Sequence, residues 1–206
     1  MIRVSDDNGL RLLVLDRHEK ANSLTRAMLG EIEAAVGSAA ADGVRALVFT
    51  GEGRVFSAGA DLDEARAGLA TDPVWERLSA AVAALPCLTI AALNGTIAGG
   101  AMGMALACDL RIAVPGTKVF YPVMKLGFRP QPSDVARLRA LVGPARAKMI
   151  LMAGVKATAE EALAWGILDR MVEPSALIDE ARSLAADALG ATPAHVAAIK
   201  AMVDGA

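Results

Sequence analysis

The segment LTIAALNGTIAGGAMGMALA, residues 88–107, contains no charged residue and is divided by Asn94-Gly95 and Gly99-Gly100. Its first six residues form a short apolar run that predicts a buried strand, and residues from about 100 to 107 predict a helix. Asn-Gly and Gly-Gly pairs are typical of turns, and with Pro86 they leave no apolar stretch long enough to cross a bilayer as one helix. We therefore expect a strand, a loop and a buried helix here, and no membrane span.

The same order of elements occurs at the start of the chain. Residues 10–15 predict a strand, and apolar residues then recur at helical spacing from Leu24 to Val36. Asn22 and Ser23 are candidate N-caps for this helix. The first unit is therefore a strand, a loop and a helix.

A second unit lies between these two. Residues 46–50 predict a buried strand, followed by a glycine-rich loop through Gly59 and a helix over residues 75–85. Strands that alternate with helices need crossover connections. The sequence therefore predicts an α/β protein with a mainly parallel sheet covered by helices.

After a further strand at 110–114 the pattern becomes mainly helical. Thr158-Ala-Glu-Glu161 resembles a capping box, and Thr192-Pro193 predicts the start of a last helix over 195–203. The chain shows no linker, low-complexity segment or repeat.

The 206 residues are enough for one domain with a substantial core. We interpret residues 1–206 as one domain, with a core over about 1–142 and a helical C-terminal part over about 143–206.

Composition excludes several classes of partner. The chain has 21 Lys+Arg against 23 Asp+Glu, a net charge of −2, so no broad basic field is available for nucleic acid or an anionic membrane. Cys87 and Cys108 lie in apolar stretches without metal-ligand spacing, and the N-terminus MIRVSDDNG has no apolar signal core. We expect a cytoplasmic protein with reduced thiols and no metal, nicotinamide or flavin site.

Two loops rich in small residues are the most informative local feature. They are FSAGAD, residues 56–61, and NGTIAGGAM, residues 94–102. Small residues let backbone amides approach a ligand, and a helix beginning near Gly100 presents unpaired N–H groups to an anion or oxyanion. The alternative is that these glycines only permit tight turns and close packing. Neither loop matches a P-loop or a dinucleotide fingerprint.

The same loops carry a resemblance to a known family. The motifs, in chain order, are LDRHEKANSL at 15–24, VFTG at 48–51 with FSAGADL at 56–62, ALNGTIAGGA at 92–101, ALACDLRI at 105–112 and AEEALAWGIL at 159–168. Together they resemble the enoyl-CoA hydratase/isomerase (crotonase) family. The resemblance implies a spiral of strand-strand-helix units, here with a shortened C-terminal helical region. It also implies assembly as trimers or paired trimers, with an extended coenzyme A bound across the loops.

The resemblance also implies where substrate would bind. The backbone N–H groups of Ala60 and Gly100 match the family's oxyanion-hole pair, which would hold a thioester oxygen and stabilise an enolate. The other residues expected at the substrate are Ala58, Asp61 and Leu62 on one loop, Lys20 and Ala21 on the opposite loop, and Val123. For Asp61 a hydrogen bond that fixes the loop is the competing interpretation.

The sequence departs from the family where hydratases carry two glutamates. The matching positions are Gly103 and Val123, neither of which can transfer a proton. Other members place a carboxylate at the position of Gln131, which stays a candidate for orienting a substrate or water but cannot serve as a general base. Standard hydration of an enoyl-CoA is therefore not expected.

Four polar residues near this segment remain as candidates: Tyr121, Lys125, Arg129 and Asp134. Each has an ordinary structural alternative, and for Asp134 it is a residue at the start of a helix over 135–141. His18 and His195 have no nucleophile partner within their motifs, so a hydrolase triad has little support.

Two functions remain open. The first is an enzyme of the hydratase/isomerase type, a lyase or isomerase of fatty acid metabolism, in which Asp134, Tyr121 or a bound water moves a proton. The second is a non-catalytic acyl-CoA-binding protein. The acyl group stays open as well, because Met102, Met104, Met124 and Phe128 could line a pocket or fill the core.

Overall fold

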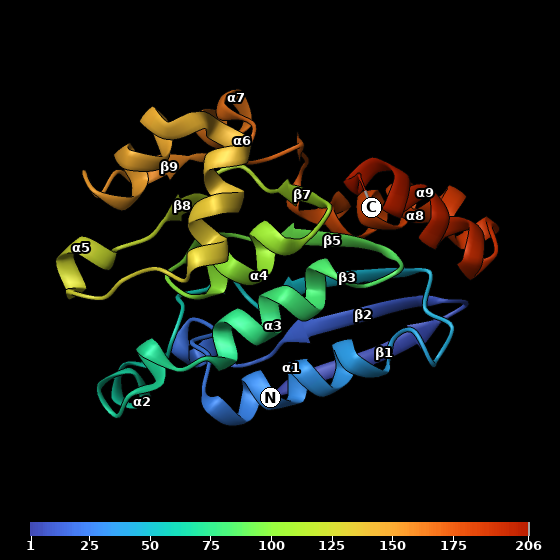
Figure 1. Ribbon diagram of the computed structural model, residues 1–206, viewed down its shortest axis with the longest axis horizontal. Coiled ribbons are helices and arrows are strands. Elements are labelled where there is room, and N and C mark those ends of the chain that lie inside the picture. The colour runs from blue at the N-terminus through green and yellow to red at the C-terminus, as the bar shows by residue number, and fades with distance from the viewer. Residues whose placement is uncertain (206) are drawn as a thin grey trace.

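The computed structural model describes residues 1–205, whose strands form two sheets (Figure 1). The larger sheet has the order β1-β2-β3-β5-β7-β10. Its strands are β1 Ile2–Asp7, β2 Leu10–Leu15, β3 Ala46–Gly51, β5 Leu88–Leu93, β7 Leu110–Ala113 and β10 Arg170–Met171. Only β1 and β2 pair antiparallel in this sheet, so the predicted mainly parallel sheet is confirmed.

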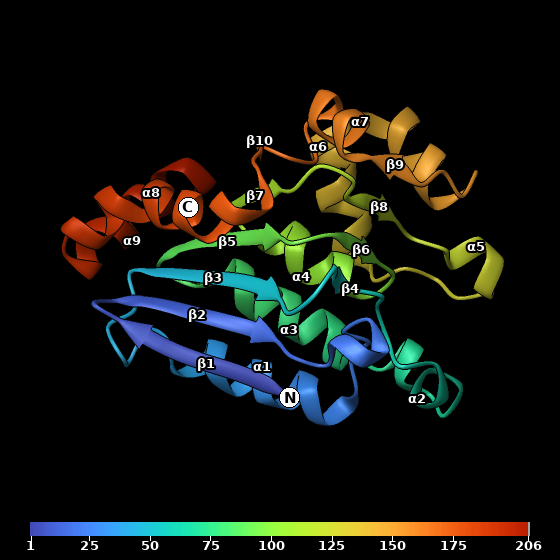
Figure 2. The ribbon, with the colours of Figure 1, turned by 180° about the vertical axis from the view of Figure 1, so that it is seen from behind.

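The smaller sheet supplies the second strand of the units that begin with β3, β5 and β7. It consists of β4 Val55–Ser57, β6 Thr96–Ala98, β8 Lys118–Phe120 and β9 Ala157–Thr158, with β4, β6 and β8 parallel. Figure 2 shows β4 and β6 beside the ends of β3 and β5. Local patterns predicted loops here because three residues are too few to show strand periodicity. The chain has the crotonase-like strand-strand-helix spiral that the resemblance implied.

Strand β1 was missed by the sequence patterns. It is an edge strand whose side chains are exposed except for half-buried Ile2, so it has no apolar alternation. Asn8-Gly9 joins it to β2 with φ angles of 50° and 89°. An Asn-Gly pair is the strongest short-range hairpin signal, and it was present in the sequence.

Alternate residues of the parallel strands face two separate cores. Leu47 and Phe49 of β3 pack in the core beneath α1 Arg26–Ser38, α3 Val74–Ala83 and α4 Ala101–Ala107. Ala46 and Val48 face the opposite side, where α8 Leu177–Gly190 packs. A strand buried on both faces reads as a continuous apolar run, which is why β3 and β5 were predictable.

The helix starts differ in detail from the sequence predictions. Helix α1 is capped by Thr25, whose side chain accepts from the backbone N–H of Met28, and not by Asn22 or Ser23. Asn22 instead has φ 50° and a fully buried side chain. The remaining helices of this part are α2 Leu62–Arg66, α5 Val123–Leu126, and the short 3-10 helices η1 His18–Lys20 and η2 Leu69–Thr71.

The C-terminal part begins within α6 Pro132–Leu151, where Gly143 is non-helical at φ 75° and ψ 169°. The capping box of α7 Ala159–Trp165 is present, and Thr192 caps α9 Pro193–Asp204, as predicted. The 3-10 helix η3 Pro174–Ala176 precedes α8. Within residues 1–205, no helix is long and apolar enough to cross a membrane.

Candidate active site

The loop after β4 and the loop before α4 touch each other. Gly59 has φ +93°, and a Cβ built on it would lie 2.8 Å from the carbonyl oxygen of Ala98 and 3.4 Å from the amide nitrogen of Gly100. A side chain at Gly59 would therefore force the loops apart. The sequence predicted small residues in both loops, and the structure brings their backbones together.

Two amides at this contact have no acceptor within residues 1–205. Their neighbours are paired: the N–H of Gly59 donates to Ser57 Oγ at 3.1 Å, and that of Asp61 donates to Leu24 O at 2.9 Å. The N–H of Gly99 donates to Phe120 O at 3.2 Å. The N–H groups of Ala60 and Gly100 donate to no atom of the described residues. These two donors are thus available to a ligand.

The two amides border a cavity of about 310 Å³. Ala58, Ala60, Leu62 and Gly100 line one side of it. Tyr121, Val123 and Gln131 line another. Seven of the residues predicted at the site therefore share one cavity, whose lining is mostly apolar and also includes Arg66 and Arg129.

Other predicted residues lie outside the cavity lining. Lys20 is exposed at the end of η1, and the carbonyl oxygen of Ala21 accepts from the N–H of Ala58 at 3.0 Å. Asp61 caps α2 through the N–H groups of Asp63 and Glu64. It also pairs with Arg17 at 2.8 Å, and that hydrogen bond lowers the pKa of its carboxyl.

Asp61 therefore makes the expected loop-fixing hydrogen bonds, and its place beside the substrate stays a prediction.

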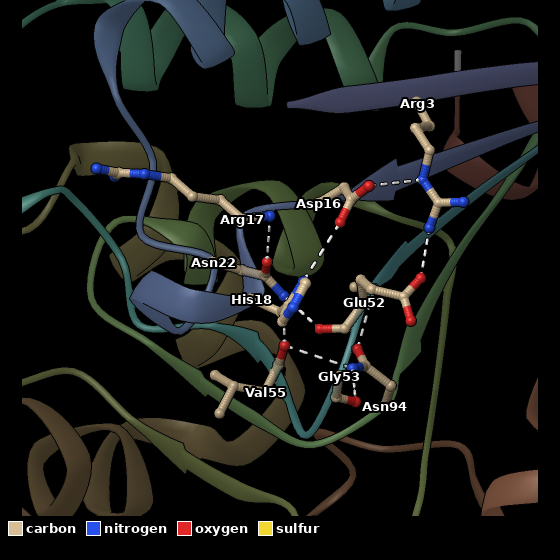
Figure 3. A network of polar contacts seen from close by, with 10 residues as sticks. Arg3, Asp16, Arg17, His18, Asn22, Glu52, Gly53, Val55 and Asn94 are labelled. Carbon is tan, nitrogen blue, oxygen red and sulfur yellow. Dashed lines mark hydrogen bonds and ion pairs between the residues drawn. The ribbon is translucent and has the colours of Figure 1, made fainter.

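Buried Asn22 and half-buried Asn94 hold the loops in place (Figure 3). The Asn22 amide donates to the carbonyl oxygens of Glu52 and Val55 at 2.9 and 2.7 Å, and its oxygen accepts from Arg17 N–H at 2.9 Å. The Asn94 oxygen accepts from Gly51 N–H at 2.9 Å, and its amide also reaches Val55 O. Asn22 and Asn94 thus converge on the turn between β3 and β4.

Tyr121 and Asp134 form a buried pair behind the opposite wall. The Tyr121 hydroxyl donates to Asp134 Oδ2 at 2.9 Å, and the two residues are 6% and 2% exposed. Burial raises the pKa of the Asp134 carboxyl to about 6, an effect that the Tyr121 hydroxyl and Arg137 only partly offset. Burial and the Asp134 charge likewise raise the pKa of Tyr121.

Asp134 is not the simple helix-start residue that the sequence suggested. The helix begins three residues earlier than predicted, at Pro132, with Gln131 as the N-cap residue. Asp134 lies in the first turn with its carboxyl turned inward, where Oδ1 has no hydrogen-bond partner among the described residues. Local sequence could not show this, because the atoms around the carboxyl belong to α4 and to the residue after β8.

The two positions without glutamate lie on this side of the site. Gly103 is buried in α4, and a Cβ there would lie 2.6 Å from Asp134 Oδ1. Val123 begins α5 and lines the cavity. Neither position carries a proton-transfer group, but the Asp134 carboxyl fills the space beside Gly103.

Several cavity residues were not singled out by sequence reasoning. Trp75, Arg66 and Leu126 line the cavity. The indole N–H of Trp75 donates to Leu69 O at 2.8 Å, which fixes the ring beneath Gly100, where a Cβ would lie 3.0 Å from the ring carbons. In the sequence, Trp75 appears only as an apolar residue at helical spacing, and that pattern indicates a core residue.

The remaining candidates fall into two groups. Arg129 and Phe128 line the cavity, whereas Met102 and Met104 are buried in the core and Met124 is 63% exposed.

His18 lies 3.5 Å from Asp16, and both thiols are buried, with the pKa of Cys87 raised to about 11. In the described part of the chain no three His, Cys, Asp or Glu side chains gather as metal ligands.

The spiral fold and the paired loop amides define a crotonase-type protein. The family model described as enoyl-CoA hydratase/isomerase matches residues 5–206. A probable enoyl-CoA hydratase, EchA17, of Mycobacterium bovis is 36% identical over 203 residues, covering 96% of this chain and 77% of the relative. The chain therefore belongs to the enoyl-CoA hydratase/isomerase family.

Solved structures agree with this assignment. The enoyl-CoA hydratase of Bacillus anthracis superposes with a TM-score of 0.91 at 30% identity, covering 98% of this chain and 82% of that one. The enoyl-CoA hydratase EchA8_6 of Mycobacterium marinum gives a TM-score of 0.89 at 31% identity, covering 98% of both chains.

Proposed function

We propose that the protein binds an acyl-CoA thioester and stabilises its enolate between the backbone N–H groups of Ala60 and Gly100. The observation that carries this proposal is the pair of unpartnered donors at the edge of the cavity. Donors that are already oriented toward a developing oxyanion need no reorganisation during the reaction, and losing one costs about 3 kcal/mol in other enzymes. Membership of the enoyl-CoA hydratase/isomerase family supports a CoA thioester as the substrate.

The proposed chemistry begins with loss of an α-proton and not with addition of water. Addition of water needs a base and an acid on one face of the alkene, and Gly103 and Val123 supply neither. Isomerisation uses the enolate formed in this way, whereas decarboxylation would form the same enolate by loss of CO2 and thioester cleavage would place a tetrahedral oxyanion between the two amides. Location in the cytoplasm and assembly as a trimer or paired trimers stay predictions.

A second function is a binding protein that holds acyl-CoA without turnover. The absence of carboxylates at Gly103 and Val123 favours it. The amide pair favours the enzyme, because binding coenzyme A does not require two donors at the thioester oxygen, whereas an enolate gains more from them than the ground state does.

A matched pair of variants at Gly100 distinguishes the enzyme from the binding protein. Gly100→Pro removes the N–H, whereas Gly100→Ala keeps it, and both place a Cβ near the Trp75 ring. Gly100 has φ −60°, which proline can adopt. The assay incubates each protein with saturated and 2-enoyl-CoA thioesters in deuterated water and follows α-deuteration by mass spectrometry, with affinity measured in parallel.

For the enzyme we expect α-deuteration by the unaltered protein and by Gly100→Ala, and a loss of 100-fold or more in Gly100→Pro at similar affinity. Equal rates in the two variants would contradict the oxyanion proposal. Tight binding with no exchange by the unaltered protein would instead establish the binding protein.

A further inference from the structure

The Tyr121–Asp134 pair is built as a buried unit at the cavity wall. Tyr121 comes directly after β8 and lines the cavity, while Asp134 lies behind it in the first turn of α6. The hydroxyl donates to Asp134 Oδ2, so one carboxyl oxygen is paired. Tyr121 therefore contacts both the cavity and a carboxyl that is only 2% exposed.

The second carboxyl oxygen of Asp134 is left without a partner. Among the described residues, the only other buried side-chain nitrogen or oxygen without a hydrogen bond is Thr117 Oγ1. A buried carboxylate with an unpaired oxygen is unfavourable, and taking up a proton relieves it. Such a group can accept a proton near neutral pH, consistent with the pKa of about 6 of the Asp134 carboxyl.

The space for this carboxyl exists only because residue 103 is glycine. A Cβ at Gly103 would lie 2.6 Å from Oδ1, closer than real Cβ contacts come. The charged groups that act on the carboxyl are Arg137 on its own helix and Glu76 on α3, while the facing α4 segment AMGMALA has no titratable residue. Ser133 Oγ joins these two, donating to Glu76 at 2.9 Å and accepting from Arg137 at 2.9 Å.

We propose that Tyr121 is the catalytic residue that carries the α-proton and that Asp134 is its positioning residue and proton reservoir. The inference rests on the function proposed above. As the α C–H bond breaks, its electron pair becomes the enolate held by the Ala60 and Gly100 amides, and the proton passes to Tyr121 Oη. The proton already on Tyr121 passes at the same time to Asp134 Oδ2.

The reverse transfer returns a proton to the α-carbon, or to the γ-carbon of a 3-enoyl thioester. The cycle consumes no co-reactant and needs no oxidant. It assigns the substrate class as CoA thioesters with an acidified α C–H bond, and the reaction class as proton transfer with or without a double-bond shift.

The test uses the full chain with butanoyl-CoA and 3-butenoyl-CoA in deuterated water. Tyr121→Phe keeps the ring and removes the hydroxyl, and Asp134→Asn keeps the shape and removes the ionisable group. We expect each to lower the exchange rate about 100-fold with little change in KM, as general acid–base groups do. Thr117→Val is the control, because it removes the other buried unpartnered oxygen and lies outside the cavity lining.

A pH profile separates a chemical role from a structural one. In the unaltered protein exchange should rise as pH increases through about 6, where Asp134 becomes able to accept a proton. In Asp134→Asn this rise should vanish. If Asp134→Asn does not fold, Tyr121→Phe and the profile of the unaltered protein carry the test.

The outcomes distinguish this inference from the function on which it rests. Exchange by the unaltered protein that persists in Tyr121→Phe at more than a third of its rate would overturn the pair and leave the oxyanion proposal standing. Binding without exchange by the unaltered protein would overturn both.

Discussion

The loops on one side of the cavity and the wall behind Tyr121 differ in how their polar side chains are paired. Next to the loops, Asn22 and Asn94 satisfy their side-chain amides with backbone groups at 2.7 to 3.4 Å. On the other wall, Asp134 keeps one oxygen without a partner. A satisfied network fixes geometry, whereas an unsatisfied carboxyl retains the capacity to change its protonation state. The difference separates a wall that positions substrate from a wall suited to proton transfer.

The largest test of this comparison is Asn22→Ala. The substitution removes the side-chain partner of the Arg17 N–H and of the Glu52 carbonyl, and leaves the Val55 carbonyl with only the longer bond from Asn94 at 3.4 Å. These backbone groups are only partly buried, so at about 1 kcal/mol for each the free energy of unfolding should fall by about 3 kcal/mol in total. Urea unfolding measures it, and exposed Lys20→Ala should change stability by less than about 0.5 kcal/mol. A loss below about 1 kcal/mol would mean that the network does not hold the loops.

The next test is the pH dependence of stability in Asp134→Asn. The folded pKa of about 6 exceeds the unfolded value of 3.8, so the folded state holds this proton more firmly and loses that stability as pH rises from about 4 to about 6. Asparagine does not titrate. From pH 4 to pH 8 the difference in unfolding free energy should therefore shift toward the variant by about 2 to 3 kcal/mol.

Urea unfolding of the unaltered protein and of Asp134→Asn at both pH values, at one protein concentration, gives the difference in unfolding free energy at each pH. Because the comparison is between pH values, a constant effect of the new amide cancels. A difference that stays the same at both pH values would show that Asp134 has an ordinary pKa.

A smaller effect tests the contact between Gly103 and Asp134. Gly103→Ala should destabilise the protein by about 1 to 2 kcal/mol, because the new Cβ meets the carboxyl. In an Asp134→Ala background the same change should be neutral or stabilising, since alanine favours a helix by about 1 kcal/mol over glycine. A double-mutant cycle from thermal or urea unfolding measures the coupling. Equal effects in both backgrounds would rule out the contact.

The smallest effect concerns the loops alone. Lys20 is exposed and was expected beside the coenzyme A, so Lys20→Ala should raise the Kd for an acyl-CoA about three-fold, with a larger effect at low salt. Exposed Lys118, which does not line the cavity, is the matched control. Equal changes in Lys20→Ala and Lys118→Ala would show only a general charge effect.

The sequence predicted the elements that bury apolar residues in a regular pattern. Strands β2 and β5 have the predicted bounds, and the capping box at Thr158 is present, because continuous apolar runs and caps are local signals. The edge strand β1 and the three-residue strands were missed, because exposure and shortness remove those signals. The N-cap of α1 was misassigned because Asn22 and Ser23 precede Thr25, and only the three-dimensional contacts show that Asn22 serves the loop network.

For the site, the sequence by itself determined the family, the two small-residue loops and the absence of carboxylates at Gly103 and Val123. These features are written in residue type and order. Tertiary structure alone decided that the Ala60 and Gly100 amides are both without acceptors and that Asp134 turns inward to Tyr121 and Gly103. The physical reason is that hydrogen-bond pairing and desolvation depend on atoms brought together from separate elements, and local sequence carries no record of those neighbours.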